Sequence, residues 1–355
     1  MRRLGSAFGA TLVAFAVLAL TSGPMAACGG LIGPNGAVNL LRTTTLAGYH
    51  DGVEHYITAF QFAGGGGKFG SITPLPGIPT NVEKGGDWTL QRLIRETSPR
   101  VLEDAFRAAV PAASGAEELM KVRIDALDLT VLRGGAADIG AWAKSHGFRL
   151  PPDSPEVLDF YASRSPIFLA AAFDGDAAAA RGQQVGDGTP VHITIPTDNP
   201  WVPLRILALG KQAAERIDAD VYLLTDVRPN LLPSPIGLNG LELAHFAPAT
   251  SSLLDDLRSD RGMGWIPQSG WLTQVRIDAA ADQLKFDLAI DATGAKAPSL
   301  IDAGLKLPSS AAGVDGATTT VDSGRAVLAL TVVLIGVVLV CVVMLGRRPT
   351  TTTIA

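Results

Sequence analysis

Cysteine is nearly absent from this sequence of 355 residues, which has two, Cys28 and Cys341. Cys341 falls within residues 326–345, a stretch without a charged side chain. Residues 28–325 therefore contain one cysteine and cannot form an internal disulfide. We expect the stability of this stretch to come from the burial of apolar side chains rather than from cross-links.

Aromatic residues and an excess of positive charge are also lacking. Phe, Trp and Tyr make up 6% of the chain, and 29 Lys and Arg face 34 Asp and Glu. Four arginines and no acidic residue lie outside residues 28–325, so this stretch carries 25 basic and 34 acidic side chains, a net charge of −9 with neutral His. Such a surface gains little from counterion release on a nucleic acid or an anionic lipid. We predict no nucleic-acid partner.

Negative charge is missing from both ends of the chain. The N-terminus has Arg2 and Arg3, an apolar run over residues 7–20 and small residues up to Ala27, which is typical of a secretory signal peptide. Residues 326–345 (AVLALTVVLIGVVLVCVVML) are uncharged and long enough to span about 30 Å of hydrocarbon as a helix. Arg347 and Arg348 follow directly, so the positive-inside rule places the short tail in the cytoplasm.

These ends define the expected organisation and location. We predict a signal peptide at residues 1–27, an extracytoplasmic domain at 28–307, a flexible stalk at 308–325, a transmembrane helix at 326–345 and a cytoplasmic tail at 346–355. The domain is long enough for one large core or for two subdomains divided near residue 185. The expected location is the cell membrane, as a single-pass protein with its N-terminal domain outside.

Alternating strands with turn signals predominate in the domain. Asp51 and Gly52 join residues 42–49 and 53–62 as a hairpin, and residues 122–132 alternate like one strand with a bulge near Ala126. Further strands are predicted at residues 68–75, 166–173, 191–195, 203–209, 218–224, 271–277 and 284–290, and helices at 90–94, 98–106, 138–146, 153–161 and 251–257. The pattern predicts an α+β fold of mostly antiparallel sheet with several short helices, plus the C-terminal transmembrane helix.

Several segments along the domain follow one another in an order that has a parallel among bacterial proteins. They are residues 27–30 (ACGG), 72–79 (ITPLPGIP), 90–99 (LQRLIRETSP), 129–150, which end in HGFRL, 203–206 (PLRI) and 271–273 (WLT), which run on to Phe286-Asp287. This order resembles the bacterial family called domain of unknown function 2330. The resemblance implies an exported, often membrane-anchored protein, and no activity, cofactor or catalytic residue carries over. The second cysteine that often follows the Cys-Gly-Gly start in the family is missing from residues 31–36.

Two residues are candidates for modification or surface binding. Residues 25–28 (MAAC) approximate a lipobox, in which Cys28 would be lipidated as the first mature residue, although Leu is usual at position 25. The alternative is ordinary cleavage near Ala27, with Cys28 left free or structural. Trp201, flanked by Pro200 and Val202, is the best candidate for a surface aromatic that stacks on a glycan.

Motifs of catalysis and metal binding fit this sequence poorly. The glycines at 64–67 before Lys68 lack the phosphate-loop spacing, since Phe62 and Phe69 stand where Gly and Ser or Thr are needed. No G-x-S-x-G, H-E-x-x-H or twelve-residue calcium loop occurs. The five histidines, for which structural or solvent roles are expected, are His50, His55, His146, His192 and His245. We predict no catalytic, cofactor-binding or metal-binding residue, although a pocket that gathered His55 or His192 with carboxylates would favour an enzyme.

The expected function follows from location rather than from a motif. We expect a non-catalytic binding or structural module of the cell envelope, whose partner is an envelope protein or a glycan. The alternatives are an envelope hydrolase with an unrecognised site and a sensor domain for a small molecule or glycan. Because the tail at 346–355 is too short for a signalling domain, a sensor would need a membrane partner.

Overall fold

The computed structural model describes residues 25–26, 30–33, 36–37, 42–61, 68–98, 118–180, 182 and 188–306. The chain divides into two compact units, Met1–Pro308 and Ser309–Ala355, and every described residue belongs to the first. Cys28 and the stretches predicted as stalk and transmembrane helix lie outside the described residues. Within the described ranges, no helix is long and apolar enough to cross a membrane.

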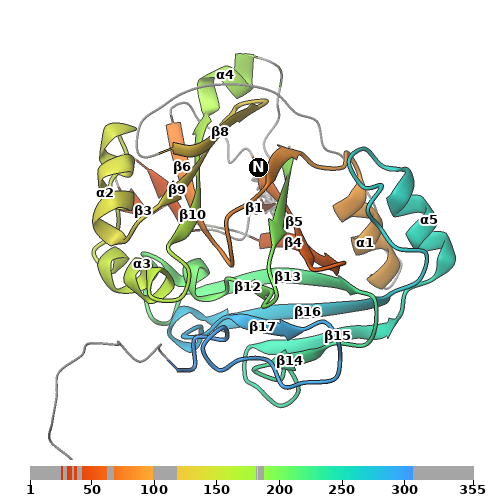
Figure 1. Cartoon of the computed structure of the whole chain (residues 1–355). Coiled ribbons are helices and arrows are strands. Elements are labelled where there is room, and N and C mark those ends of the chain that lie inside the picture. Colours follow the sequence, from red (N-terminus) through yellow and green to blue (C-terminus); the bar gives the residue numbers. More distant parts are fainter. Residues whose placement is uncertain are drawn as a thin grey trace, which may run out of the picture. The chain divides into compact units, whose positions relative to one another are not determined.

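Three β-sheets form the centre of the first unit (Figure 1). Sheet A contains β1 Met25–Ala26, β4 Arg42–His50, β5 Val53–Gln61, β7 Asn81–Lys84, β11 Gly188–Pro196, β13 Arg216–Thr225, β15 Leu241–Pro248 and β16 Trp271–Ala280, in the order β15-β16-β13-β4-β5-β11-β7 with β1 beside β4. Sheet B contains β2 Gly30–Gly33, β3 Gly36–Ala37, β6 Lys68–Leu75, β8 Glu118–Ile124, β9 Leu127–Arg133 and β10 Ile167–Asp174, in the order β3-β2-β6-β10-β9-β8. Sheet C contains β12 Trp201–Val202, β14 Asn230–Leu232 and β17 Leu288–Asp291.

Short helices cover the sheets. They are α1 Thr89–Thr97, α2 Ala136–Ser145, α3 Ser154–Ala162, α4 Gly175–Ala180 and α5 Ser251–Ser259, with the 3₁₀ turns η1 Arg205–Ala208 and η2 Ala281–Gln283. In Figure 1, α1 and α5 lie on one side of the sheets, and α2 and α3 lie on the opposite side. Among the described strands, every paired set is antiparallel except β1 with β4 and β4 with β13. The predicted α+β class with mostly antiparallel sheet is confirmed.

Three apolar cores separate these layers. The largest joins inner faces of the sheets, with Ala47 of sheet A and Leu129 of sheet B among its buried members. A second packs α2 and α3 against sheet B through residues such as Trp142 and Phe168. The third packs α1 and α5 against the outer face of sheet A, where Ile57 is fully buried. The central strands of sheet A are therefore buried on both faces, so their polar side chains are removed from water and need partners within the protein.

The predicted hairpin at residues 42–62 is confirmed and has a clear local cause. Asp51 and Gly52 both have positive φ, 50° and 77°, as the two central residues of a type I′ turn require. Asp and Gly tolerate this left-handed conformation better than other residues. The turn sets the register of β4 and β5, so that Gly48 lies opposite His55.

Two sequence predictions of strands are wrong. Residues 122–132 form parts of two strands, because Asp125 adopts φ 58° and reverses the chain between β8 and β9. Residues 203–209 contain the 3₁₀ turn η1 instead of a strand. The N–H groups of Leu204 and Arg205 donate to Oδ1 of Asp287, and this side-chain acceptor replaces a strand partner.

Candidate functional site

His55 and His192 meet on the face of sheet A that α1 and α5 cover. His192 of β11 pairs with Ile57, and His55 of β5 pairs with Thr194, so the two imidazoles are diagonal neighbours on one face. Nδ1 of His55 lies 2.9 Å from Nε2 of His192, and one ring donates a hydrogen bond to the other. The exposed fractions are 9% for His55 and 2% for His192.

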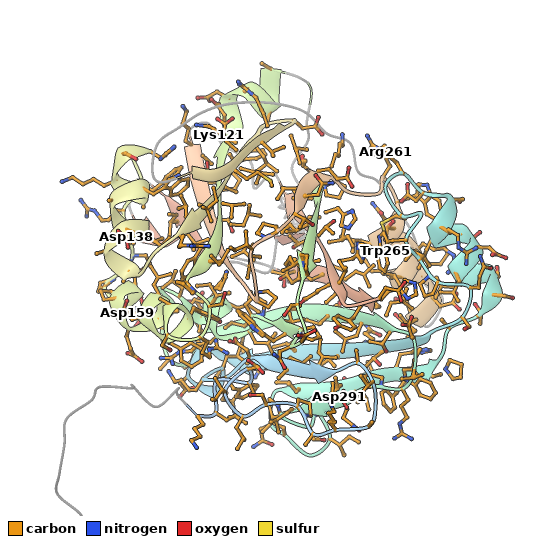
Figure 2. The ribbon with its side chains drawn as sticks, viewed as in Figure 1. Lys121, Asp138, Asp159, Arg261, Trp265 and Asp291 are labelled. Carbon is orange, nitrogen blue, oxygen red and sulfur yellow. The ribbon has the colours of Figure 1, made fainter. Side chains whose placement is uncertain are left out.

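Trp265 closes the outer side of this pair. Its indole stacks on the His55 ring with centroids 3.9 Å apart and planes inclined by 1°. Figure 2 shows Trp265 on the side of the sheets where α1 and α5 lie. The stack depends on Gly48 in the neighbouring strand, since any Cβ at that position would overlap the indole ring.

The loop that carries Trp265 is held by two residues near the end of α5. Arg258 donates from Nε and Nη2 to the carbonyl oxygens of Ile266 and Pro267, at 3.0 and 2.9 Å. Asp260, which is 6% exposed, accepts hydrogen bonds from the N–H groups of Asp87 and Trp88. Asp260 thereby caps the N-terminus of α1 and fixes the loop to that helix.

Glu83 extends the histidine pair toward solvent. It lies on the edge strand β7, directly opposite His192, and its side chain is 46% exposed. Its Oε1 lies 3.4 Å from Nδ1 of His192, close enough for an ion pair but without hydrogen-bond alignment. Glu83, His192 and His55 therefore form a row from the surface to the indole, in which only the two histidines are joined by a hydrogen bond. The structure thus brings together the two histidines and a carboxylate.

Burial keeps both imidazoles neutral. Burial, followed by the charges of the neighbouring His192 and His50, lowers the pKa of His55 to about 3. Burial also lowers the pKa of His192, against the opposing effect of Glu83. A neutral, hydrogen-bonded pair is therefore the form present at pH 7.

We expect this pair to make the fold sensitive to acid. The unfolded-state pKa of a histidine is about 6.5 and the folded-state pKa of His55 is about 3, so the folded state binds fewer protons and loses stability as the pH falls through this window. Between pH 7 and pH 5 the native chain should lose about 2 kcal/mol of unfolding free energy relative to His55→Gln, as measured by urea unfolding. The neutral control Ile57→Val on the same strand should show a constant difference, and a constant difference for His55→Gln would contradict the assignment.

The other three histidines lie apart from this cluster. His50 contacts Asp226 through Nδ1 at 2.7 Å, and His146 ends α2 and stacks on Trp142. His245 is on β15, at the opposite edge of sheet A from Glu83. Among the described residues, no group of three or more His, Cys, Asp or Glu side chains is arranged to hold a metal ion.

The prediction that Trp201 is a surface aromatic is wrong, because its side chain is buried. Its exposed fraction is 2%, and its ring stacks on Tyr161 at 5.8 Å between centroids. Arg164 lies over the same ring, 4.9 Å from its centroid. Strand β12 pairs with β17 and directs the indole into the core between α3 and sheet C.

A buried ion pair, Arg164 with Asp287, is the centre of this second polar cluster. The two side chains are 1% and 0% exposed. Oδ1 of Asp287 accepts from the Tyr161 hydroxyl at 2.7 Å, and Tyr161 Oη accepts in turn from the N–H of Ile206 at 2.8 Å. Arg164 donates to the carbonyl oxygen of Asp302 at 2.6 Å. Burial, and then the charge of Asp287, raise the pKa of Tyr161, so its hydroxyl remains a donor.

Glu54 is a third buried polar residue, on the opposite face of β5 from His55. It is 0% exposed, and neither carboxyl oxygen has a well-aligned hydrogen bond with a described residue. Burial raises its pKa to about 8, against the weaker opposing effect of the Trp201 backbone N–H. Glu54 is therefore mostly protonated at neutral pH.

Sequence comparison points to one bacterial family. A family model described as "Uncharacterized protein conserved in bacteria (DUF2330)" matches residues 23–232. This range contains His55, His192, Glu83 and Trp201, whereas Trp265 and Asp287 lie beyond it. No curated protein sequence matches the chain.

Structural comparison finds crystal structures of baculovirus P35. P35 itself gives a TM-score of 0.38 at 10% identity over 71% of this chain and 96% of P35. A mutated P35 after caspase cleavage gives 0.39 at 9% identity, over 71% and 99% of the two chains. The caspase-8/P35 complex gives 0.34 at 8% identity, over 71% and 90%. Similarity at this level does not establish a shared fold.

Proposed function

We propose that this chain, which belongs to the bacterial family described as "Uncharacterized protein conserved in bacteria" (DUF2330), is a non-catalytic binding or structural module of the cell envelope. The proposal assigns residues 1–27 to export, residues 326–345 to a single membrane anchor and the domain between them to the outside of the cell. It rests on the basic and apolar N-terminus and on the uncharged stretch followed by Arg347 and Arg348.

The geometry of the histidine pair is the structural observation that supports a non-catalytic role for this domain. His55 and His192 are the two imidazoles that lie close to a carboxylate and to one another. Their rings are engaged in a mutual hydrogen bond and in stacking of His55 on Trp265. A general base must reach the proton of a substrate, and Trp265 covers the outer face of His55. This arrangement favours a rigid structural role for the pair over catalysis.

The location is tested by protease treatment of intact spheroplasts. We expect added protease to digest the domain of the full-length chain without lysis, because the domain faces outward. A matched variant that lacks residues 2–24 should stay in the cytoplasm and be protected until lysis. Full protection of the native chain in intact spheroplasts would overturn the proposed location.

The binding role is tested separately in the same cells. Cross-linking in whole cells, followed by mass spectrometry of the purified chain, should recover a specific envelope protein or glycan. The variant without residues 2–24 should not recover that partner, because it never reaches the envelope. Recovery of the same proteins from both variants would count against a binding role at the envelope.

A further inference from the structure

The exposed apolar side chains of the described residues gather around sheet C. Seven large apolar side chains are exposed, and four of them lie in residues 226–240 and 291–306, which contain β14 and the end of β17. They are Val227, Ile236, Leu300 and Leu305, with exposed fractions of 49%, 75%, 52% and 47%. We call these two segments the sheet C surface. Single exposed apolar residues are common, but a group of them marks a contact surface.

Hydrogen bonds hold the two segments together. Nδ2 of Asn230 donates to the carbonyl oxygen of Lys296 at 2.8 Å. The N–H of Leu305 donates to the carbonyl oxygen of Leu300 at 2.9 Å, so both leucines belong to one turn. The carbonyl oxygen of Ala303, in the same turn, accepts from the backbone of the residue that precedes β17. Both segments are therefore fixed to sheet C.

The sheet C surface lies where the described chain ends, at Lys306. In Figure 1, β14 and β17 lie at the lower edge of the first unit and β8 lies at the upper edge. Figure 2 shows Asp291 and Lys121 at these two edges. The predicted stalk, residues 308–325, spans about 23 Å on average as a flexible chain. Behind the proposed membrane anchor, so short a tether gives the sheet C surface a high effective concentration of lipid.

The charges of this surface are arranged for contact with phosphate groups. Arg228, Lys296 and Lys306 are exposed, and none of them forms an ion pair with a carboxylate of the described residues. The three carboxylates of the surface are each engaged within the protein: Asp226 with His50, Asp291 with the N–H groups of Thr293 and Lys296, and Asp302 with Ser299. The side chains that are left to meet a partner are therefore apolar or cationic.

We propose that the sheet C surface docks on a lipid bilayer. The four apolar side chains enter the boundary between headgroups and acyl chains, and the three cations contact the phosphates that every phospholipid carries. A bilayer is favoured over a protein partner because the tether already holds the surface near lipid, so a weak contact is sufficient. This inference rests on the proposed function in one respect, since it needs the proposed anchor.

The test places one fluorophore on the full-length chain in phosphatidylcholine vesicles that contain a nitroxide-labelled lipid. Cys28→Ser and Cys341→Ser remove the native thiols, and Ser234→Cys places the label at an exposed position near Ile236. A second chain carries the label at Leu119→Cys on β8 instead. We expect the nitroxide to quench the label at position 234 and to leave the label at position 119 bright. Equal quenching at the two positions, or none at position 234, would overturn the proposal.

Matched variants of the chain labelled at position 234 identify the contact. Ile236→Ser should lower the ratio of docked to undocked domain about tenfold, because it removes the most exposed apolar side chain from the bilayer. The control Leu119→Ser removes an apolar side chain that is 38% exposed on β8, and should leave this ratio unchanged. Equal effects of the two substitutions would reject the sheet C surface as the site of contact.

Two further readouts separate the other outcomes. If the label at position 234 is shielded from iodide in the water but is not quenched by the nitroxide lipid, a second copy of the chain covers the surface and the lipid assignment is wrong. Flotation with the vesicles at high salt reports the anchor alone. A chain that does not float lacks the proposed anchor, which rejects the proposed function and this inference with it. A chain that floats without quenching at position 234 rejects only the docking.

Discussion

The variant Arg164→Met is expected to lower the free energy of unfolding by about 3–5 kcal/mol. The methionine fills similar space, but the Asp287 carboxylate, which is 0% exposed, would lose its counter-ion. A buried charge without a partner is strongly destabilising because no water solvates it. The same substitution also removes the hydrogen bond to the carbonyl oxygen of Asp302.

A double variant separates the charge from the packing. In Arg164→Met/Asp287→Asn the neutral amide can still accept from the Leu204 N–H through its oxygen, so we expect it to recover part of the lost stability. The measurement is urea unfolding of all four members of the cycle, monitored by tryptophan fluorescence. If the double variant is no more stable than Arg164→Met, unpaired charge is not the cause.

An exposed ion pair supplies the matched control. Arg216 and Asp278 pair across β13 and β16 with side chains 63% and 61% exposed. Arg216→Met should change the unfolding free energy by less than about 1 kcal/mol, because solvent already screens the pair. A similar loss for Arg164→Met and Arg216→Met would contradict the role of burial.

Local signals in the sequence were sufficient to predict many of the strands and helices. The Asp51-Gly52 turn predicted its hairpin, since both residues tolerate positive φ and both strands alternate. The Asp125 turn was missed, because Asp-Ala lacks the glycine that marks most such turns and the flanking residues continue the alternation. An alternating pattern alone therefore does not locate a two-residue turn within it.

The polar clusters depend on long-range register, which one sequence does not contain. His55 and His192 are 137 residues apart, and their contact depends on how β5 pairs with β11. Arg164 and Asp287 are 123 residues apart and meet through α3 and the chain that leads into β17. Trp201 was expected at the surface, whereas the pairing of β12 with β17 places its indole in the core.

The second large effect concerns Glu54 and appears as a dependence of stability on alkaline pH. The pKa of this carboxyl is about 4.5 in a model peptide and about 8 in the folded protein, where burial disfavours the charged form. The folded state therefore holds a proton that the unfolded chain loses above pH 4.5. Stability from this proton is fully present below pH 4.5 and is lost as the pH rises through 8. Between pH 5 and pH 9 this loss amounts to about 3–5 kcal/mol.

Glu54→Gln removes that titration while it keeps the size of the side chain. The unfolding free energy of Glu54→Gln, relative to the native chain, should rise by about 3–5 kcal/mol between pH 5 and pH 9. Measuring the difference at each pH cancels the contribution of His55 and His192, which both chains share. Ile195→Val, at the position paired with Glu54 across β11 and β5, changes packing without changing a proton site and should differ from the native chain by a constant amount. A constant difference for Glu54→Gln as well would mean that the Glu54 carboxyl is ionised in the folded protein and that the sheets accommodate its charge.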